Sequence, residues 1–284
     1  MSIGGILTAM VTPFDADGGV DEAAFVRLLG YLLENGSDGV VVAGTTGEGP
    51  TLHDEERFRL FELAVKEAGD APVIAGTGSN DTAHSVRLTS RATELGVDGV
   101  LVVTPYYNKP NRGGLIAHFE AVAEATDKPV VLYNIPSRCV IDLPNDLLAE
   151  LAGIPNVAAV KQANPDHVAA IAGLDLLAGN DDMLAEVLDL GGTGGITVAS
   201  HLFGGEMRRM IDEPERRGEI DASLADAFEA LAITANPIPV KAALNLLGIE
   251  VGGLRLPLVE ATVDERKVIH SMLDRHGLLT TSSA

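Results

Sequence analysis

The sequence contains little sulfur and few aromatic rings. Its single cysteine, Cys139, excludes an intramolecular disulfide framework and argues against a metal site built from thiolates. Tryptophan is absent and aromatic residues make up only 4% of the 284 residues, while hydrophobic residues make up 46%. This is ample for one large core, which must be built mainly from aliphatic side chains. Such a composition suits a layered α/β architecture.

Positive charge is also scarce. The chain has 20 basic and 41 acidic residues, which gives a net charge of -21, and only six of the basic residues are lysines. A nucleic-acid backbone would be repelled, and no basic patch is present, so we expect no nucleic-acid partner. An acidic surface poor in lysine fits a protein that works in concentrated salt, where screening weakens self-repulsion. An ordinary acidic bacterial enzyme is the alternative.

Long apolar runs and targeting signals are missing. No stretch approaches the roughly 18 apolar residues that a membrane-spanning helix needs, and the N-terminal segment MSIGGILTAMVTPFD has no basic region before its apolar residues. We therefore expect a cytoplasmic protein without a membrane partner. The chain also has no H-x-H or clustered Asp and His set, so we expect no metal.

One pattern repeats along the chain: a short apolar run, a loop, and then a segment with helical periodicity. Segments 21–36 and 54–69, for example, have apolar residues at spacings of three and four and end near a glycine. The apolar runs are continuous rather than alternating, which is typical of strands covered on both faces in a parallel sheet. They cover residues 5–11, 39–44, 72–77, 99–104, 129–134, 157–163, 176–180 and 194–199.

Eight such units predict a closed (β/α)8 TIM barrel over residues 1–220. A doubly wound open sheet is the rival, but no G-x-G-x-x-G follows the first run. The strand signals then stop, and segments 221–235, 238–247 and 260–276 have helical patterns. The sequence therefore predicts a C-terminal helical extension over residues 221–284.

In barrels of this kind the active site lies where strands end and loops begin. Polar residues do follow several of the apolar runs, and Lys161 lies inside the sixth run, in the stretch NVAAVKQAN. We expect them to converge on one rim. They are Thr45 and Thr46, Tyr106 and Tyr107, Tyr133, Arg138 and Lys161.

Each of these residues has a possible functional role and a possible structural role. A lysine amine in an apolar barrel has a lowered pKa and can condense with a ketone, but Lys161 could equally form a structural ion pair. Tyr133 could relay protons or only hydrogen-bond in the core. The GTTGEG turn (44–49) could bind a carboxylate or only cap a loop. Arg138 could hold a second carboxylate or a surface ion pair.

Together these groups describe one reaction class. An amine traps a keto acid as a Schiff base, a hydroxyl-lined turn holds its carboxylate, and a tyrosine moves protons. The Schiff base withdraws electrons, so the adjacent carbon loses a proton and attacks an aldehyde. No cofactor is expected, because the covalent bond to Lys161 supplies the activation.

The motifs also resemble a known family. They are GTTGEGPT (44–51), VTPYYNKP (103–110), LYNIPSR (132–138), VKQA (160–163), NPIPVKAAL (236–244) and GLRLPL (253–258). In this order, over about residues 4–275, they resemble the dihydrodipicolinate synthase family, which belongs to the pyruvate-dependent class I aldolases that include N-acetylneuraminate lyase. The resemblance implies a lyase that condenses pyruvate with aspartate 4-semialdehyde to 4-hydroxy-tetrahydrodipicolinate, in lysine and diaminopimelate synthesis. It also implies a homotetramer arranged as a dimer of dimers.

The resemblance assigns four catalytic residues. Lys161 matches the Schiff-base lysine and Tyr133 the proton-relay tyrosine. Thr45 matches the relay threonine, and Tyr107 matches a tyrosine that reaches into a neighbouring subunit's site.

Four further residues are assigned to substrate binding on the same ground. Thr46 matches the pyruvate-carboxylate contact, and Arg138 the arginine that holds the semialdehyde carboxylate. Ile196 falls where a backbone carbonyl approaches the lysine. Gly179 begins a motif that the family often continues as G-D-D, where this chain has Asn180.

Other departures concern regulation and the strand of the lysine. The family usually has a glutamate after the Schiff-base lysine, and this chain has Gln162. Lysine-inhibited members carry a carboxylate where this chain has His84. The resemblance places His84 with His53, Asn80 and Tyr106 in an effector site. A histidine is a poor partner for an ammonium group, so we expect weak or absent inhibition by lysine.

Two other functions compete. A 2-keto-3-deoxygluconate-type or other sugar-acid aldolase would share the lysine, the tyrosine and the turn, but would generally replace Arg138. A non-catalytic keto-acid sensor would not need the proton relay of Tyr133 and Thr45.

Overall fold

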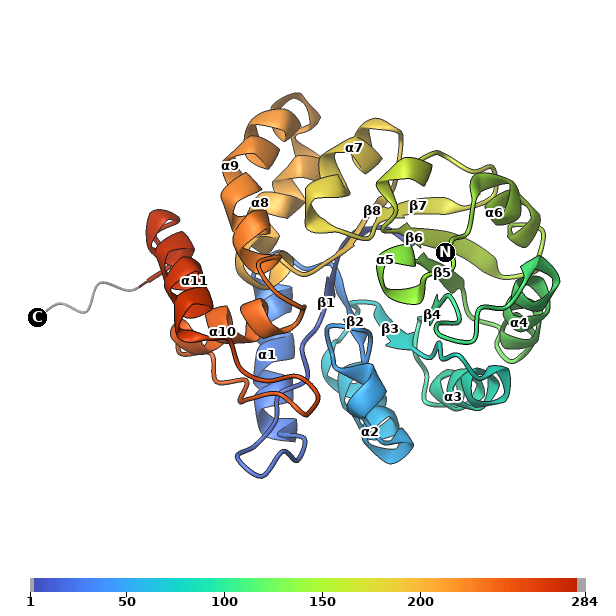
Figure 1. Cartoon of the computed structure of the whole chain (residues 1–284), viewed down its shortest axis with the longest axis horizontal. Coiled ribbons are helices and arrows are strands. Elements are labelled where there is room, and N and C mark those ends of the chain that lie inside the picture. The colour runs from blue at the N-terminus through green and yellow to red at the C-terminus, as the bar shows by residue number, and fades with distance from the viewer. Residues whose placement is uncertain (1–2, 280–284) are drawn as a thin grey trace, which may run out of the picture.

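The computed structural model describes residues 3–279, and within this range eight parallel strands close into a barrel in sequence order, β1 to β8. Each strand pairs with the next, and β1 pairs with β8, with Leu7 opposite Ile196. Figure 1 shows the strands at the centre with the helices around them. The strands are β1 Gly5–Ala9, β2 Gly39–Val42, β3 Val73–Gly76, β4 Gly99–Val103, β5 Val130–Asn134, β6 Val157–Gln162, β7 Asp175–Ala178 and β8 Gly194–Thr197. The predicted TIM barrel is confirmed.

In the described residues, α-helices follow seven of the eight strands and cover the outside of the barrel, whereas only the short 3-10 helix Pro165–His167 lies between β6 and β7. They are α1 Glu22–Glu34, α2 Asp54–Glu67, α3 Thr82–Glu94, α4 Arg112–Glu124, α6 Asn145–Leu151, α7 Leu184–Asp189 and α8 Ser200–Asp212, with the short α5 Pro136–Cys139 inside the β5–α6 loop. Several begin at side-chain caps: Asp21 accepts a hydrogen bond from the backbone N–H of Ala24, and Asn111 from that of Gly114. Such caps satisfy amides that have no partner within the helix.

The strands separate two apolar cores. Side chains that point outward, such as Val40, Val100 and Val160, pack against the helices in the larger core. Side chains that point inward, such as Ala159 and Leu177, fill the barrel. Because successive side chains of a strand point to opposite faces, both faces are buried and each strand is apolar throughout. This explains the continuous apolar runs of the sequence.

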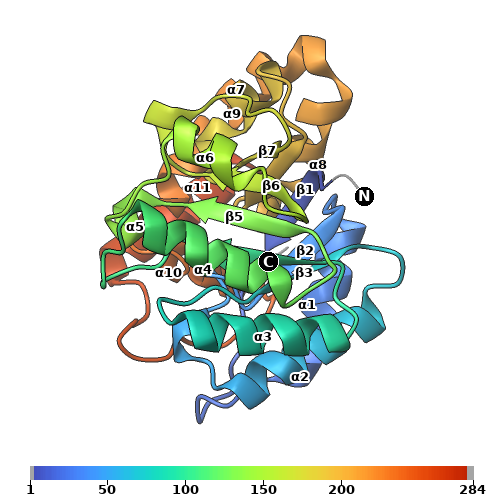
Figure 2. The same cartoon turned by 90° about the vertical axis from the view of Figure 1, so that its right-hand side faces the viewer.

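Up to residue 279, where the description ends, three α-helices follow the barrel: α9 Arg217–Leu231, α10 Ile238–Leu246 and α11 Val263–Arg275. They lie together on one side, next to α8 and α1, as the orange and red ribbons show (Figures 1 and 2). The three predicted helical segments are therefore confirmed, although α9 already begins at Arg217. In the described part of the chain, no helix has the length and apolar character to cross a membrane.

Candidate active site

Lys161 points into the barrel because of its place in β6. Ala159 and Ala163, on either side of it with the same orientation, belong to the inner core, whereas Val160 belongs to the outer one. The register places Lys161 beside Tyr133 on β5 and Leu177 on β7. The small alanines leave space around the long side chain. Alternation along the strand therefore puts the amine inside the barrel, near the end from which the loops leave.

The surroundings of Lys161 favour the neutral amine. The residue is 5% exposed, and its Nζ lies 4.2 Å from the centroid of the Tyr133 ring. Burial lowers the pKa of Lys161 to about 7; the carboxylate of Asp181 opposes this shift, and the guanidinium of Arg138 adds to it. Lys241, also buried, forms an ion pair with Glu48 at 2.8 Å, so this chain does use a structural lysine elsewhere. The pKa of Lys161 is lowered too, but Lys161 forms no ion pair in residues 3–279, so its amine stays available to a ligand in the cavity that it lines, as a nucleophile requires.

Tyr133 and Thr45 lie beside the amine. Tyr133 is 5% exposed, and burial raises the pKa of its phenol, while Arg138 and a contact with the Thr45 hydroxyl act in the opposite direction. A phenol with a raised pKa stays protonated near neutral pH, so it can donate its proton to a leaving hydroxyl and take it back. Thr45 lines the same cavity as Lys161 and Tyr133. Tyr107, by contrast, is 86% exposed and lines neither of the two cavities at the barrel mouth.

The turn after β2 presents Thr46 to the cavity. Thr46 is buried, and its hydroxyl accepts a hydrogen bond of 2.9 Å from Asn236 Nδ2. Gly49 is required in this turn, because a Cβ there would lie 2.5 Å from the carbonyl oxygen of Ala43. The turn is further closed by a 3.0 Å hydrogen bond from the Gly49 N–H to the Gly44 carbonyl. Hydroxyls and a tightly wound backbone thus face the space next to Lys161, as a carboxylate subsite needs.

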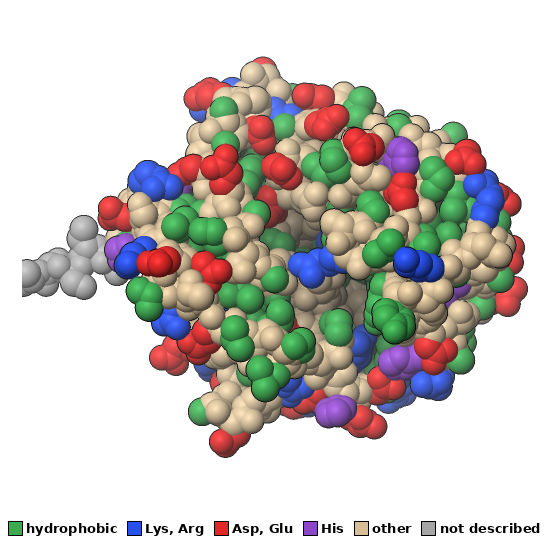
Figure 3. Space-filling view, in the orientation of Figure 1, with side chains coloured by type: hydrophobic (Ala, Val, Ile, Leu, Met, Phe, Trp, Pro, Cys, Tyr) green, Lys and Arg blue, Asp and Glu red, His purple; other side chains and the backbone are tan. Residues whose placement is uncertain are grey.

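Arg138 stands at the mouth on α5. It lines both cavities, and its Nη2 donates to the carbonyl of Asn236 at 3.4 Å. No ion pair of Arg138 is found in residues 3–279, so the surface salt bridge considered from the sequence is not what the structure shows. In the space-filling view, blue groups border a hollow at the middle of this face, whereas red side chains are spread around its periphery (Figure 3). A free guanidinium at such a rim is suited to hold a carboxylate.

The cavity containing Lys161 has a volume of about 590 Å³ and is bordered by the loops after β2, β5, β7 and β8 and by α9. Gly179 lines it, and a Cβ at this position would lie 2.7 Å from the carbonyl oxygen of Gln162. Ile196 is fully buried in β8, within the inner core, and does not line this cavity; Val198 does.

Sequence reasoning missed Asp181 and left Asn236 without a role. The carboxylate of Asp181 accepts hydrogen bonds from the N–H groups of Val198 (2.8 Å) and Ala199 (3.0 Å), and burial raises its pKa. It thereby ties the loop after β7 to the loop after β8. Asn236 joins Thr46 to Arg138, and its own Oδ1 is buried without a partner. Asp181 follows an apolar run, so the rule that located the other residues could have found it.

Gln162 has a structural explanation. Its Oε1 accepts from Asn134 Nδ2 (3.0 Å) and from the N–H of Asn164 (2.9 Å), while its Nε2 donates to the carbonyl of His167 (3.2 Å). The last bond needs a donor, which an ionised glutamate lacks. The amide thus satisfies a fully buried site without burying a charge there.

The four residues of the possible effector site have different partners in the structure. His84 Nε2 pairs with Asp54 Oδ1 at 2.8 Å, and His53 is an exposed residue at the start of α2. The backbone carbonyl of Asn80 accepts a hydrogen bond from Asn108. Tyr106 alone of the four lines a second cavity, of about 240 Å³, which shares Thr45, Tyr133, Ile135 and Arg138 with the first.

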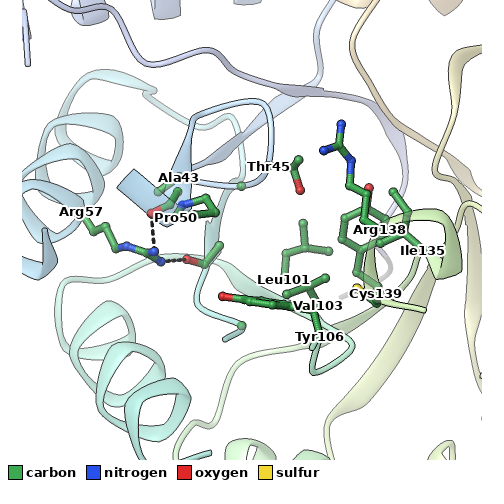
Figure 4. Close-up of a pocket in the computed structure, with 15 residues that line it drawn as sticks. Ala43, Thr45, Pro50, Arg57, Leu101, Val103, Tyr106, Ile135, Arg138 and Cys139 are labelled. Atoms are coloured by element: carbon green, nitrogen blue, oxygen red, sulfur yellow. Dashed lines mark hydrogen bonds between the residues drawn. The ribbon is translucent and has the colours of Figure 1, made fainter. Parts of the chain in front are cut away.

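Arg57, which the sequence reasoning did not single out, extends into this second cavity from α2, opposite Arg138 (Figure 4). It is 7% exposed and donates to the carbonyls of Gly49 (2.5 Å) and Gly76 (3.4 Å), and its Nε has no partner. The cavity therefore contains a buried positive charge.

Comparison with known proteins identifies the family of the chain. A sequence model of the dihydrodipicolinate synthetase family matches residues 2–276. The chain is 45% identical to 4-hydroxy-tetrahydrodipicolinate synthase 2 of Halalkalibacterium halodurans, over 97% of this chain and 99% of the relative. It is 46% identical to 4-hydroxy-tetrahydrodipicolinate synthase of Bacillus subtilis, over 96% and 99%. The crystal structure of the enzyme from Cyanidioschyzon merolae with lysine bound superposes with a TM-score of 0.94, at 41% identity, over 97% of this chain and 99% of the other. The chain therefore belongs to the dihydrodipicolinate synthetase family.

Proposed function

We propose that this enzyme condenses pyruvate with L-aspartate 4-semialdehyde to give 4-hydroxy-tetrahydrodipicolinate, through a Schiff base on Lys161. The observation that carries the proposal is the amine of Lys161, buried beside Tyr133 with its pKa lowered to about 7. The relatives that match nearly the whole chain are named for this activity. The reaction needs no cofactor, because the imine on Lys161 provides the electron sink.

Each residue of the candidate site has its own part in the proposed condensation. The neutral amine of Lys161 adds to the keto carbon of pyruvate, and the resulting hydroxyl leaves as water with a proton supplied through Tyr133 and Thr45. Thr46 and its turn hold the pyruvate carboxylate throughout. The imine then lets the methyl group lose a proton, and the enamine carbon bonds to the aldehyde carbon, whose oxygen becomes a hydroxyl. The amino group of the bound semialdehyde can finally displace Lys161 from the imine, which closes the ring and frees the enzyme.

Arg138 favours the semialdehyde over a sugar-acid substrate. Its guanidinium borders both cavities without an ion pair of its own in residues 3–279. A carboxylate on the second substrate would satisfy it, whereas a polyol would call for neutral hydrogen-bonding partners. The sugar-acid aldolase is therefore the second candidate, and a keto-acid sensor is less suitable because Tyr133 and Thr45 would have no purpose in it.

A second copy of the chain completes the proposal. Tyr107 has a positive φ of 72° and is 86% exposed, and Val140 in the neighbouring loop is 66% exposed. Large side chains presented in this way are typical of a surface that another subunit covers. We propose a homotetramer, a dimer of dimers, in which Tyr107 joins the proton relay of a neighbouring site. The buried, unpaired thiol of Cys139 fits a reducing compartment, which supports a cytoplasmic location.

Regulation by lysine is proposed to be weak or absent. A structural relative has lysine bound, but in this chain His84 is already paired with Asp54, and the cavity beside Tyr106 contains Arg57. A second cation would be repelled there. The effector site of His53, Asn80, His84 and Tyr106 therefore lacks a free carboxylate for an ammonium group.

Two experiments test the function. A coupled assay with pyruvate should give turnover with aspartate semialdehyde and little with the aldehyde partner of a 2-keto-3-deoxygluconate aldolase; the reverse preference would establish the alternative. Borohydride reduction with labelled pyruvate should place the adduct on Lys161. Lys161→Ala should lose the adduct and keep its circular dichroism spectrum, while Lys109→Ala, which removes an exposed lysine, should be trapped like the wild type. Absence of any adduct on the wild-type protein would favour the sensor.

A further inference from the structure

A buried ion pair joins the C-terminal helices to the turn that lines the substrate cavity. Lys241 on α10 and Glu48 in the turn are 1% and 2% exposed, and Lys241 Nζ lies 2.8 Å from Glu48 Oε1. The second oxygen, Oε2, accepts a 3.0 Å hydrogen bond from the backbone N–H of Arg255. Lys241 Nζ also donates to the carbonyl of Gly253 at 2.5 Å and lies 4.3 Å from the centroid of the Phe14 ring. Both charges are therefore fully satisfied inside the protein.

Burying this ion pair costs folding free energy. Burial lowers the pKa of Lys241, and the charge of Glu48 opposes this effect only in part. Glu48 also adopts a left-handed backbone conformation with φ of 54°, which is unfavourable for a residue with a Cβ. Replacing a buried ion pair by apolar residues of similar volume is often neutral or stabilising. Fold stability alone thus gives no reason to have charges here, and a geometric requirement does.

The geometry connects the pair to the substrate turn by two routes. Glu48 lies in the same turn as Thr46, and Lys241 lies in the same segment as Asn236, which donates to the Thr46 hydroxyl at 2.9 Å. The N–H of Lys241 donates to the carbonyl of Pro237 at 3.1 Å in the first turn of α10, and Asn236 directly precedes this turn. Residues 236–241 therefore contact the turn after β2 at two places, through the ion pair of Lys241 with Glu48 and through the amide of Asn236.

We propose that Lys241 and Glu48 are positioning residues that hold Thr46 and Asn236 in the arrangement that binds the pyruvate carboxylate. Neither side chain touches the substrate; they act through the turn. The inference rests on the proposed function for the identity of the ligand. It predicts a specific defect: without the pair the carboxylate subsite loosens, so more pyruvate is needed for half-maximal Schiff-base formation, while Lys161 still reacts fully at saturation.

The test measures borohydride trapping of the full-length protein as a function of pyruvate concentration. Lys241→Met keeps the length of the side chain and removes the charge. We expect its half-saturating pyruvate concentration to rise at least tenfold, with the wild-type extent of trapping at saturation. Leu273→Ala is the matched control, because it opens a cavity in the buried face of α11 and destabilises the C-terminal helices without touching the turn. Its half-saturation should stay within twofold of the wild type.

A second variant covers the case in which Lys241→Met does not fold, since it leaves Glu48 as an unpaired buried charge. Glu48→Gln combined with Lys241→Met removes both charges, and it should fold and show the same tenfold shift. Wild-type half-saturation in either folded variant, or an equal shift in Leu273→Ala, would overturn the proposal.

Hydrogen exchange separates this inference from the proposed function. In the ligand-free protein, the amides of residues 44–52 should exchange at least tenfold faster in the double variant than in the wild type, and those of α3 should not change. If the wild-type protein were not trapped by pyruvate, the proposed function would fail while this local loosening could still be observed. Unchanged exchange in residues 44–52 would refute the positioning role in either case.

Discussion

The pH dependence of Schiff-base formation tests the central feature of the site, the neutral amine of Lys161. Burial lowers its pKa to about 7. About half of the amine is then neutral at pH 7, whereas only about one in 3,000 molecules would be neutral at the ordinary lysine pKa near 10.5. A pKa of about 7 in place of 10.5 means that burial favours the neutral form by about 5 kcal/mol more than water does.

The rate of trapping by subsaturating pyruvate should follow the neutral fraction. We expect about a tenfold increase per pH unit below pH 6, a midpoint near 7 and a plateau above pH 8, measured by borohydride reduction and mass spectrometry over pH 5.5–9.5. The carboxylate of Asp181 raises the pKa of Lys161, so Asp181→Asn should move the midpoint to lower pH. A rate that still rises tenfold per unit between pH 8 and 9 would show an ordinary, charged lysine and would refute the reasoning.

Four further outcomes are expected. Lys161→Met should raise the unfolding temperature at pH 7, because the buried amine costs the wild-type protein up to about 4 kcal/mol of folding stability at that pH. The pKa of Lys161 is lower in the folded than in the unfolded protein, so the stability gained by the variant is full below pH 7 and fades towards pH 10.5. A constant gain in stability across that range would contradict the reasoning. Arg138→Ala should lower kcat/KM for the semialdehyde about 10- to 100-fold while pyruvate trapping changes little, and equal losses for both substrates would count against its role. Millimolar lysine should leave turnover nearly unchanged because His84 is paired with Asp54 and Arg57 occupies the nearby cavity; strong inhibition at submillimolar lysine would be the contrary result. Raising KCl from about 0.1 to 2 M should raise the melting temperature by at least about 4 °C, because salt screens the net charge of -21, and no gain would argue for an ordinary acidic enzyme.

The sequence by itself determined the barrel and the place of its candidate site. The continuous apolar runs mark strands buried on both faces, and their number and alternation with helical segments leave little choice of architecture. Lys161 lies at the end of the sixth run, and Thr45 and Tyr133 lie after or within other runs. Because strand ends gather at one rim of a barrel, these residues are expected to converge there. These inferences depend on local periodicity, which a linear sequence records directly.

Only the tertiary structure decided which partners the side chains meet. It gave Lys241 an ion pair with Glu48 and left Lys161 without one among the described residues, although both are buried lysines that lie over an aromatic ring. It likewise brought Asn236 to Thr46 across 190 positions of the chain, and placed Arg57 in a cavity where the sequence suggested only a helix face. Such contacts depend on the relative placement of distant segments, and a residue's charge state depends on the solvent and charges that this placement leaves around it.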